Sequence, residues 1–180
     1  WVAFFLGLGF LFVTWFFRDP ERHIPNEPNV IVSPADGKIT EIVTEKEPIN
    51  GELCKRVTIF LSVFNVHVNR VPIAGTIEEI RYNPGKFLAA FNPKASMDNE
   101  QNIILINNGK THVFVKQIAG LIARRIVCWP KKGDYYESGQ RYGLIRFGSR
   151  VDILLPETAK LSVACGDRVS GGKSIIGYLT

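Results

Sequence analysis

The sequence predicts a mainly antiparallel β domain, of sandwich or barrel type, preceded by an N-terminal membrane helix. The first seventeen residues are apolar and carry no charge, which is typical of a helix in lipid. After Pro20, short segments rich in β-branched and aromatic residues recur between turn signals. The rest of the chain shows no long amphipathic helical pattern. We therefore expect an all-β domain behind the helix.

The composition indicates one domain, or one domain with an appendage. At 180 residues and 46% hydrophobic content, the chain is long enough to bury a core without stabilising disulfides or metal sites. Cys54, Cys128 and Cys165 show no metal-ligand spacing and their number is odd, so we expect no disulfide scaffold, no metal site and a reducing compartment. The net charge of +5 is spread along the chain without a basic block that alternates with aromatics. This argues against a nucleic-acid partner and suits an anionic membrane surface.

Residues 1–17 are predicted to form a membrane anchor. As a helix they would extend about 25 Å, near the lower limit for crossing a bilayer. Aromatic and then basic residues follow at the end of the run: Trp15, Phe16, Phe17, Arg18 and Arg22. This order is typical of a membrane interface and, by the positive-inside tendency, places the domain on the cytoplasmic side of the cell membrane. The chain begins at Trp1 rather than Met, so we expect the anchor to be truncated at its N-terminus.

Residues 18–34 are predicted to form a linker, because the prolines in this stretch prevent a continuing helix. The domain is expected to cover residues 35–180. Turn signals separate its strands, and Asn108-Gly109 is the strongest hairpin signal among them. The predicted strands are 37–44, 56–63, 66–71, 76–82, 102–107, 111–119, 122–127, 143–155, 160–165 and 174–179.

The predicted strand at 143–155 carries an unusual serine. With a period of two, one face holds Ile145, Phe147, Ser149, Val151, Ile153 and Leu155. Ser149 is the one polar residue on that face, and it follows Gly148, which lets another group approach closely. A hydroxyl in this position can be a structural donor beside a bulge glycine. With a nearby base it can instead attack the carbonyl of residue 148, and the pattern alone favours the structural interpretation.

Two other segments supply candidate partners for such a nucleophile. Asp36 lies on an Asp-Gly turn, where a carboxylate is usually structural but is also well suited to orient an imidazole. His67 is expected on the strand at 66–71, on one face with Asn65 and Asn69. A lone histidine on a strand is usually structural. Its titration near neutrality nevertheless makes His67 the best candidate base in the chain.

The connection at 83–100 has little strand character, and long irregular segments of this kind are often lids or binding loops. Phe87 and Phe91 are candidates for contact with acyl chains. Lys86 and Asn99 are candidates for contact with a phosphate or a headgroup. A surface loop without a binding role is an equal alternative.

Four motifs occur in a fixed order along the chain. They are Ser33-Pro34-Ala35-Asp36-Gly37, Asn65-Val66-His67-Val68-Asn69-Arg70-Val71-Pro72, Pro84-Gly85-Lys86-Phe87 and Arg146-Phe147-Gly148-Ser149-Arg150. Each is weak alone, but together they resemble the phosphatidylserine decarboxylase family in its short bacterial and archaeal form. The resemblance extends from the predicted anchor to the C-terminus.

This resemblance implies a proenzyme that cuts itself between Gly148 and Ser149. Ser149 would become a covalent pyruvoyl group, the only prosthetic group of the enzyme. Asp36 would hold His67 in the required tautomer, and His67 would take the proton from the Ser149 hydroxyl. The resemblance thus overrides the structural interpretation of the serine.

The resemblance also implies a membrane-associated lyase of phospholipid biosynthesis. Its pyruvoyl group would form a Schiff base with the amino group of phosphatidylserine and accept the electrons released with carbon dioxide, which yields phosphatidylethanolamine. The fragments 1–148 and 149–180 would stay together as a heterodimer. A homo-oligomer is left open.

The chain also departs from the longer relatives, which carry Leu-Gly-Ser-Thr at the cut and two histidines spaced His-x-x-His. Here Arg70 takes the second histidine position. We therefore expect His67 to serve both self-cleavage and decarboxylation, or another residue to assist it. Archaetidylserine, the ether-linked archaeal counterpart, is an alternative substrate for the same mechanism.

Because the segment at 164–177 resembles the closing half of lipoyl and biotinyl carrier domains, a non-catalytic, lipoyl-like, membrane-tethered β domain is a further alternative. Against a carrier, the sequence offers no Met-Lys or Asp-Lys hairpin that would accept the prosthetic group.

Overall fold

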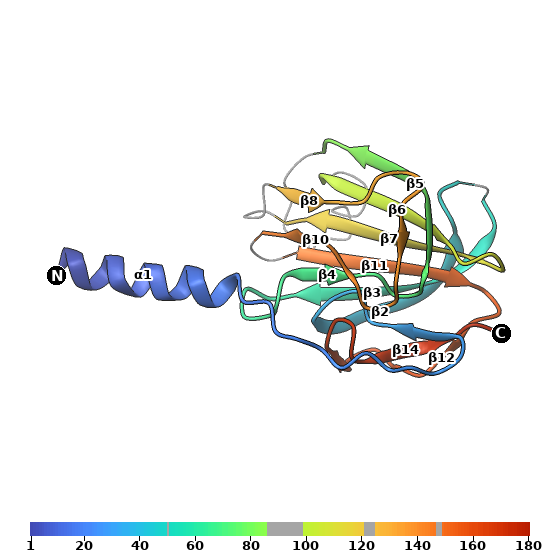
Figure 1. Ribbon diagram of the computed structural model, residues 1–180, viewed down its shortest axis with the longest axis horizontal. Helices are drawn as coiled ribbons and strands as arrows, with labels where there is room; N and C mark the ends of the chain where they lie inside the picture. The colour runs from blue at the N-terminus through green and yellow to red at the C-terminus, as the bar shows by residue number, and fades with distance from the viewer. Residues whose placement is uncertain (50, 86–98, 121–124, 147–148) are drawn as a thin grey trace.

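The computed structural model describes residues 1–49, 51–85, 99–120, 125–146 and 149–180. Within these residues one helix, α1 (Val2–Phe16), projects from a domain of β-strands (Figure 1). The strands are β1 (Val30–Val32), β2 (Gly37–Lys46), β3 (Leu53–Leu61), β4 (Val68–Arg70), β5 (Gly75–Asn83), β6 (Gln101–Asn107), β7 (His112–Ala119), β8 (Ile126–Cys128), β9 (Tyr135–Tyr136), β10 (Arg141–Ile145), β11 (Ser149–Pro156), β12 (Lys160–Leu161), β13 (Arg168–Val169) and β14 (Ile175–Tyr178).

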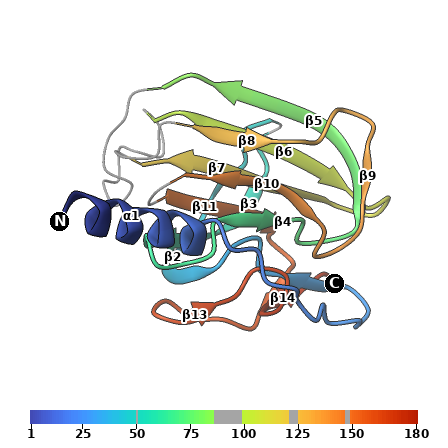
Figure 2. The same cartoon turned by 60° about the vertical axis from the view of Figure 1, so that its left-hand side comes forward.

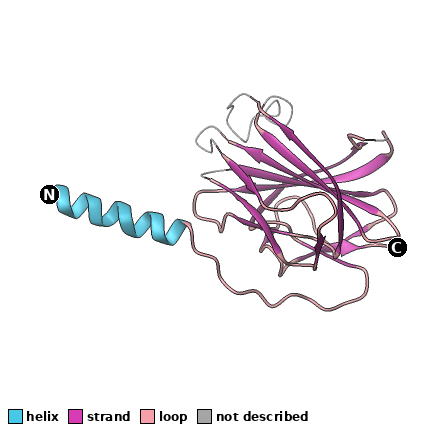
Figure 3. Ribbon diagram, turned by 45° about the horizontal axis from the view of Figure 1, so that its top comes forward, coloured by secondary structure: helices cyan, strands magenta, loops and turns pink. Residues whose placement is uncertain are grey.

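The largest sheet has the strand order β13-β2-β3-β11-β7-β6-β5-β9 and curls into a half-barrel (Figures 1 and 3). Two three-stranded sheets, β1-β14-β12 and β4-β10-β8, complete the domain. Every strand pairing in the described part of the chain is antiparallel. The predicted mainly antiparallel β class is therefore confirmed.

The main apolar core joins the three sheets. Ile31 of β1, Ile176 of β14 and Tyr142 of β10 are fully buried and pack with inward residues of the large sheet. Figure 2 shows β4, β8 and β10 across one face of the large sheet, where β8 and β10 contact β7. Because burial of apolar surface contributes roughly 25 cal/mol per Å², this shared core holds the small sheets in place.

Within the small sheet, β10 and β8 approach each other so closely that one position must be glycine. Gly143 of β10 is paired with Asn69 on one side and Cys128 on the other. A Cβ atom at this position would overlap the carbonyl oxygen of Val127 and lie 3.1 Å from Nε2 of Gln117 on β7. The backbone of β10 therefore contacts its neighbours directly.

The prediction of one strand from Gly143 to Leu155 is wrong. β10 ends at Ile145 and β11 begins at Ser149. They lie in different sheets, since β10 pairs with β4 and β8 whereas β11 pairs with β3 and β7. No pairing partner is shared between the two strands, so they are separate elements. Ile145 before the break and Val151, Ile153 and Leu155 after it all belong to the main core, which made the apolar pattern look continuous.

Two other predicted strands differ from the structure. β4 covers Val68–Arg70, so His67 lies just before it and not on the strand predicted at 66–71. β8 covers Ile126–Cys128, toward the C-terminal end of the strand predicted at 122–127, part of which lies outside the described residues. The predicted segments elsewhere overlap β2, β3, β5, β6, β7, β12 and β14.

The N-terminal segment also differs in part from the prediction. α1 has 15 residues, and the described portion of the chain contains no helix with the length and apolar character needed to cross a bilayer. The predicted linker at 18–34 includes β1, whose residues are buried and pair with β14. The last part of that linker is therefore built into the domain.

We expect Gly143→Ala to lower the free energy of unfolding by about 2 kcal/mol, because the added methyl group would overlap the Val127 carbonyl. Gly7→Ala is the matched control, since a Cβ there meets nothing within 4 Å. Urea denaturation followed by circular dichroism measures both variants. Equal stability of the two would contradict the close packing of β10.

Candidate functional site

Ser149 is the first residue of β11, in the middle of the large sheet. Its cross-strand neighbours are Leu61 on β3 and Ala119 on β7. The side chain is fully buried, and within the described residues its Oγ has no hydrogen-bond partner. An unpaired buried hydroxyl costs about 1–3 kcal/mol, so a native structure usually has a reason for keeping one. A hydroxyl in this state can act as a nucleophile once a base removes its proton.

The chain passes from the small sheet to the large sheet between Ile145 and Ser149. The amide of Ile145 donates a hydrogen bond to the carbonyl of His67 at 3.3 Å. His67 therefore lies beside the start of this crossing, and the predicted scissile bond lies at its end. Phe147 and Gly148 are outside the described residues. The topology thus places the candidate base and the candidate nucleophile at the two ends of one short connection.

The His67 imidazole is buried and neutral. The residue is 2% exposed, and its Nδ1 lies 2.9 Å from the carbonyl oxygen of Asn65. Because a carbonyl can only accept, Nδ1 carries the proton and Nε2 is left as the basic atom. Burial lowers the pKa of His67 to about 4; the hydrogen bond to Asn65 opposes this shift and the charge of Arg18 adds to it. At neutral pH the ring is therefore in the state that a general base requires.

The predicted contact, in which the His67 imidazole would donate a hydrogen bond to Asp36, is not formed. The Asp36 carboxylate accepts hydrogen bonds from Arg22 at 2.8 and 3.1 Å, and from the amide of Gly171 at 2.7 Å. Nδ1 of His67 is instead hydrogen-bonded to the Asn65 carbonyl, which fixes the tautomer in place of Asp36. A guanidinium binds a carboxylate more strongly than a neutral imidazole does, which explains the exchange of partners. In this structure Asp36 joins the start of β2 to the linker and to the turn before β14.

A chain of buried amide side chains, not predicted from the sequence, lies between β4, β7 and β6. Gln117 Nε2 donates to Asn69 Oδ1 at 2.9 Å, and Asn102 Nδ2 donates to Gln117 Oε1 at 3.3 Å. Gln117 lies two residues before Ala119 and therefore on the same face of β7, the face that neighbours Ser149. The available sequence signal was a glutamine at an otherwise apolar inward position of a strand.

Asn99 is the one predicted substrate contact in the described part of the chain. Its side chain is fully buried, and Nδ2 donates to the carbonyl of Ala119 at 2.7 Å. Because Ala119 is paired with Ser149, Asn99 lies at the Ser149 end of the sheet. The other predicted contacts lie outside the described residues: Lys86, Phe87 and Phe91.

Arg70, at the position of a second histidine in longer relatives, binds the linker. Its guanidinium donates to the carbonyl of Gly139 at 3.0 Å, to the carbonyl of Pro20 at 3.1 Å and to the carboxylate of Asp19 at 3.2 Å. A guanidinium does not lose its proton in proteins and cannot serve as a base. Arg70 therefore has a structural role, and His67 is the basic side chain that this segment supplies.

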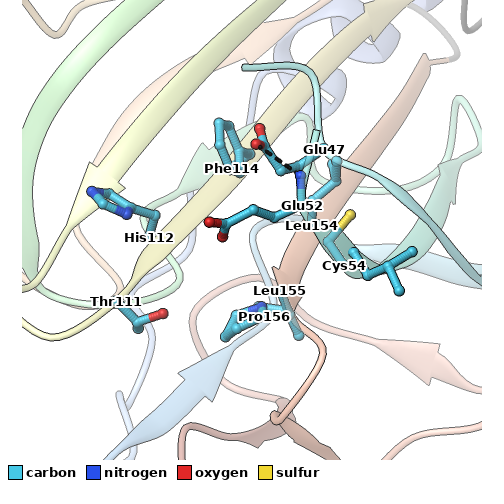
Figure 4. A pocket seen from close by; sticks show the side chains of 10 residues that line it. Glu47, Glu52, Cys54, Thr111, His112, Phe114, Leu154, Leu155 and Pro156 are labelled. Carbon is cyan, nitrogen blue, oxygen red and sulfur yellow. Dashed lines mark hydrogen bonds between the residues drawn. The ribbon is translucent and has the colours of Figure 1, made fainter. Parts of the chain in front are cut away.

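A cavity of about 70 Å³ lies at the opposite end of β11. Figure 4 shows Glu47, Glu52 and His112 around it, with Leu155 at its base. At about 3.3 Å per residue, Leu155 is about 20 Å along the strand from Ser149. Of the predicted site residues that the structure describes, none lines this cavity, which lies away from Ser149.

Comparison with known proteins places these residues in a family context. The family model for phosphatidylserine decarboxylase matches residues 10–177. A protein of Syntrophus aciditrophicus called phosphatidylserine decarboxylase proenzyme is 47% identical over 180 residues, covering 98% of this chain and 84% of the relative. Proteins of the same name from Desulfotalea psychrophila and Symbiobacterium thermophilum are both 50% identical, over 99% and 94% of this chain and 84% and 80% of their own lengths.

We expect the buried neutral His67 to make stability depend on pH. Its folded pKa of about 4 lies below the value of about 6.5 for an unfolded histidine, so the unfolded state binds the extra proton between these values. The free energy of unfolding should therefore fall by about 2 kcal/mol from pH 7 to pH 5 through this group alone.

The measurement is urea denaturation at both pH values of Ser149→Ala, which cannot be cut, and of Ser149→Ala/His67→Gln, which lacks the titrating ring. Between pH 7 and pH 5, the free energy of unfolding of the double variant should fall by about 2 kcal/mol less than that of Ser149→Ala. An identical fall in both proteins would contradict the burial of a neutral His67.

Proposed function

Since the chain belongs to the phosphatidylserine decarboxylase family, we propose that it converts phosphatidylserine to phosphatidylethanolamine after cutting its own backbone between Gly148 and Ser149. The observation that carries the proposal is the buried Ser149 hydroxyl without a partner in the described residues, at the end of a crossing that begins beside the neutral His67. Family membership indicates the reaction, and this arrangement supplies a nucleophile and a base.

The cleavage is an exchange of an amide for an ester, followed by elimination. Nε2 of His67 takes the proton of the Ser149 hydroxyl, and Oγ attacks the carbonyl carbon of Gly148. The peptide C–N bond breaks, its nitrogen takes the proton from His67, and Gly148 is left as an ester on the Ser149 oxygen. Loss of the Cα proton of residue 149 then expels the Gly148 carboxylate. Water replaces the nitrogen at Cα, ammonia leaves, and residue 149 becomes a pyruvoyl ketone.

Residue 149 fits a pyruvoyl group on structural grounds. The conversion removes the buried unpaired hydroxyl, while the backbone of residue 149 stays at the head of β11 between Leu61 and Ala119. When formed there, the group supplies an electron-accepting carbonyl for the loss of carbon dioxide from an amino-acid headgroup. The surrounding burial excludes water and disfavours the carboxylate charge, and His67 can give or take a proton at Nε2.

Strand pairing supports a stable pair of cleavage products. The fragment 149–180 contains β11, β12, β13 and β14. Of these, β11 pairs with β3 and β7, β13 with β2, and β14 with β1. All of these partners belong to the fragment 1–148, and none of the described ladder pairs is interrupted by a cut before residue 149. We therefore include a heterodimer of the two fragments in the proposal.

We also propose that the domain lies at the cytoplasmic face of the cell membrane, where its phospholipid substrate is available. The support is the apolar surface of α1, on which Phe10 is 71% exposed. The helix ends at Phe16, and the guanidinium of Arg18 lies 3.8 Å from the centre of the ring of the preceding Trp15. An apolar surface that ends in an aromatic and basic rim suits the boundary between acyl chains and anionic headgroups.

We expect purified protein to give two fragments on a denaturing gel, with the fragment 149–180 blocked to N-terminal sequencing because it has lost its amino group. Ser149→Ala should remain one intact chain, and His67→Gln should be cut at least about 100-fold more slowly. Ser162→Ala, which changes an exposed serine of the same fragment, is the control and should be cut normally. A wild-type chain that decarboxylates lipid while uncut would refute the mechanism. A prosthetic mass on a lysine would support the carrier alternative.

Carboxyl-labelled phosphatidylserine in mixed micelles should release labelled carbon dioxide with the cut protein, and Ser149→Ala should release none. Borohydride added with the lipid should leave a covalent lipid adduct on the fragment 149–180. The same assay with archaetidylserine, which has the same headgroup on ether-linked chains, measures whether the site distinguishes the two lipids. Absence of carbon dioxide with both lipids would overturn the assignment.

A further inference from the structure

The last turn of α1 packs on the loop that carries His67. Most of α1 is exposed, but Phe16 is fully buried. The centre of its ring lies 4.3 Å from the centre of the His67 ring, with 34° between the two planes. The neighbouring Trp15 contacts the ring of Phe64, on the same loop, at 6.2 Å between centres. Two consecutive aromatic residues of the helix thus contact the segment that positions the candidate base.

Arg18 stabilises the contact between the end of α1 and the His67 loop. Its guanidinium donates one hydrogen bond to the carbonyl of Phe64 at 2.8 Å and another to the carbonyl of Trp15 at 3.0 Å. It also lies over the ring of Trp15, where a cation–π interaction is favourable. The end of the helix and the His67 loop are therefore linked by polar contacts as well as by ring packing.

We propose that Phe16 is a positioning residue for self-cleavage: its ring covers the His67 imidazole, excludes water from it and fixes its orientation toward the crossing. The proposal rests on the function proposed above, in which His67 is the base. It gives α1 a second role, because the segment expected to hold the protein at the membrane would also complete the surroundings of the base.

The physical reason is solvent exclusion. Burial is the largest influence on the pKa of His67 and favours the neutral ring. Of the charged groups in the described chain, Arg18 acts on that pKa, also in the direction of the neutral ring. The carboxylate of Asp36 is occupied by Arg22 and Gly171 and does not contact the imidazole. Removal of the Phe16 ring would open one face of the imidazole to water and leave its other contacts in place.

The first measurement is the His67 titration by NMR in intact chains that carry Ser149→Ala. With Phe16→Ala added, the pKa of His67 should rise toward the ordinary value of about 6.5. Phe10→Ala, which removes the same ring from an exposed position of the same helix, should leave it unchanged. Phe16→Leu keeps an apolar side chain and should give a smaller rise. An unchanged His67 pKa in both Phe16 variants would overturn the proposal.

The second measurement is the rate of self-cleavage of freshly synthesised full-length chains in detergent, where membrane attachment plays no part. The wild-type chain and Phe10→Ala should be cut at similar rates at pH 8 and pH 5.5. Phe16→Ala should be cut about ten-fold more slowly at pH 5.5 than at pH 8, because a base with a pKa near 6.5 is then mostly protonated. Phe16→Leu keeps an apolar side chain, so its loss of cleavage rate between pH 8 and pH 5.5 should lie between those of the wild-type chain and Phe16→Ala.

The outcomes separate the two proposals. A wild-type chain that is never cut, while the His67 pKa responds to Phe16→Ala, refutes self-cleavage and leaves the covering of His67 established. Normal cleavage with the same pH profile in Phe16→Ala and Phe10→Ala refutes the positioning role and leaves the proposed function intact. If Phe16→Ala does not fold, Phe16→Leu decides by the same two readouts.

Discussion

The pairing of β11 on both edges is the constraint on which the rest of the structure depends. This strand is hydrogen-bonded to β3 along its whole length and to β7 along most of it. Its first residue, Ser149, is therefore fixed in a buried position that its own hydroxyl does not favour. The same ladders would retain the fragment 149–180 after a cut. One set of backbone hydrogen bonds thus holds the nucleophile in place and keeps the products together.

The two faces of β11 have separate tasks. Ser149 faces the interior, whereas Arg150 lies on the other face and binds Asp152 at 2.6 and 2.9 Å and Thr58 at 3.1 Å. These groups are almost fully buried, so the ion pair needs the bidentate geometry that it has. The arginine of the Phe-Gly-Ser-Arg motif is thereby explained as a structural residue that fastens the start of the strand.

The surroundings of His67 come from segments far apart in the chain. Asn65 orients the ring, Phe16 covers it, and Ile145 fixes its backbone. Each contact acts on a different property of the imidazole: its tautomer, its solvation and its place beside the crossing. Burial keeps the His67 ring neutral at neutral pH, which is the protonation state that a proton acceptor requires. Its low pKa is therefore mainly a consequence of packing.

The sequence by itself determined the β class, most strand positions and the candidates Ser149 and His67, because alternation, turn residues and short motifs are local properties. The tertiary structure decided which strands pair, and it split the stretch 143–155 between two sheets that share one apolar core. It also paired the Asp36 carboxylate with Arg22 and packed the Phe16 ring against His67. These outcomes depend on competition among partners that are distant in the chain, and spacing along a sequence carries no record of that competition.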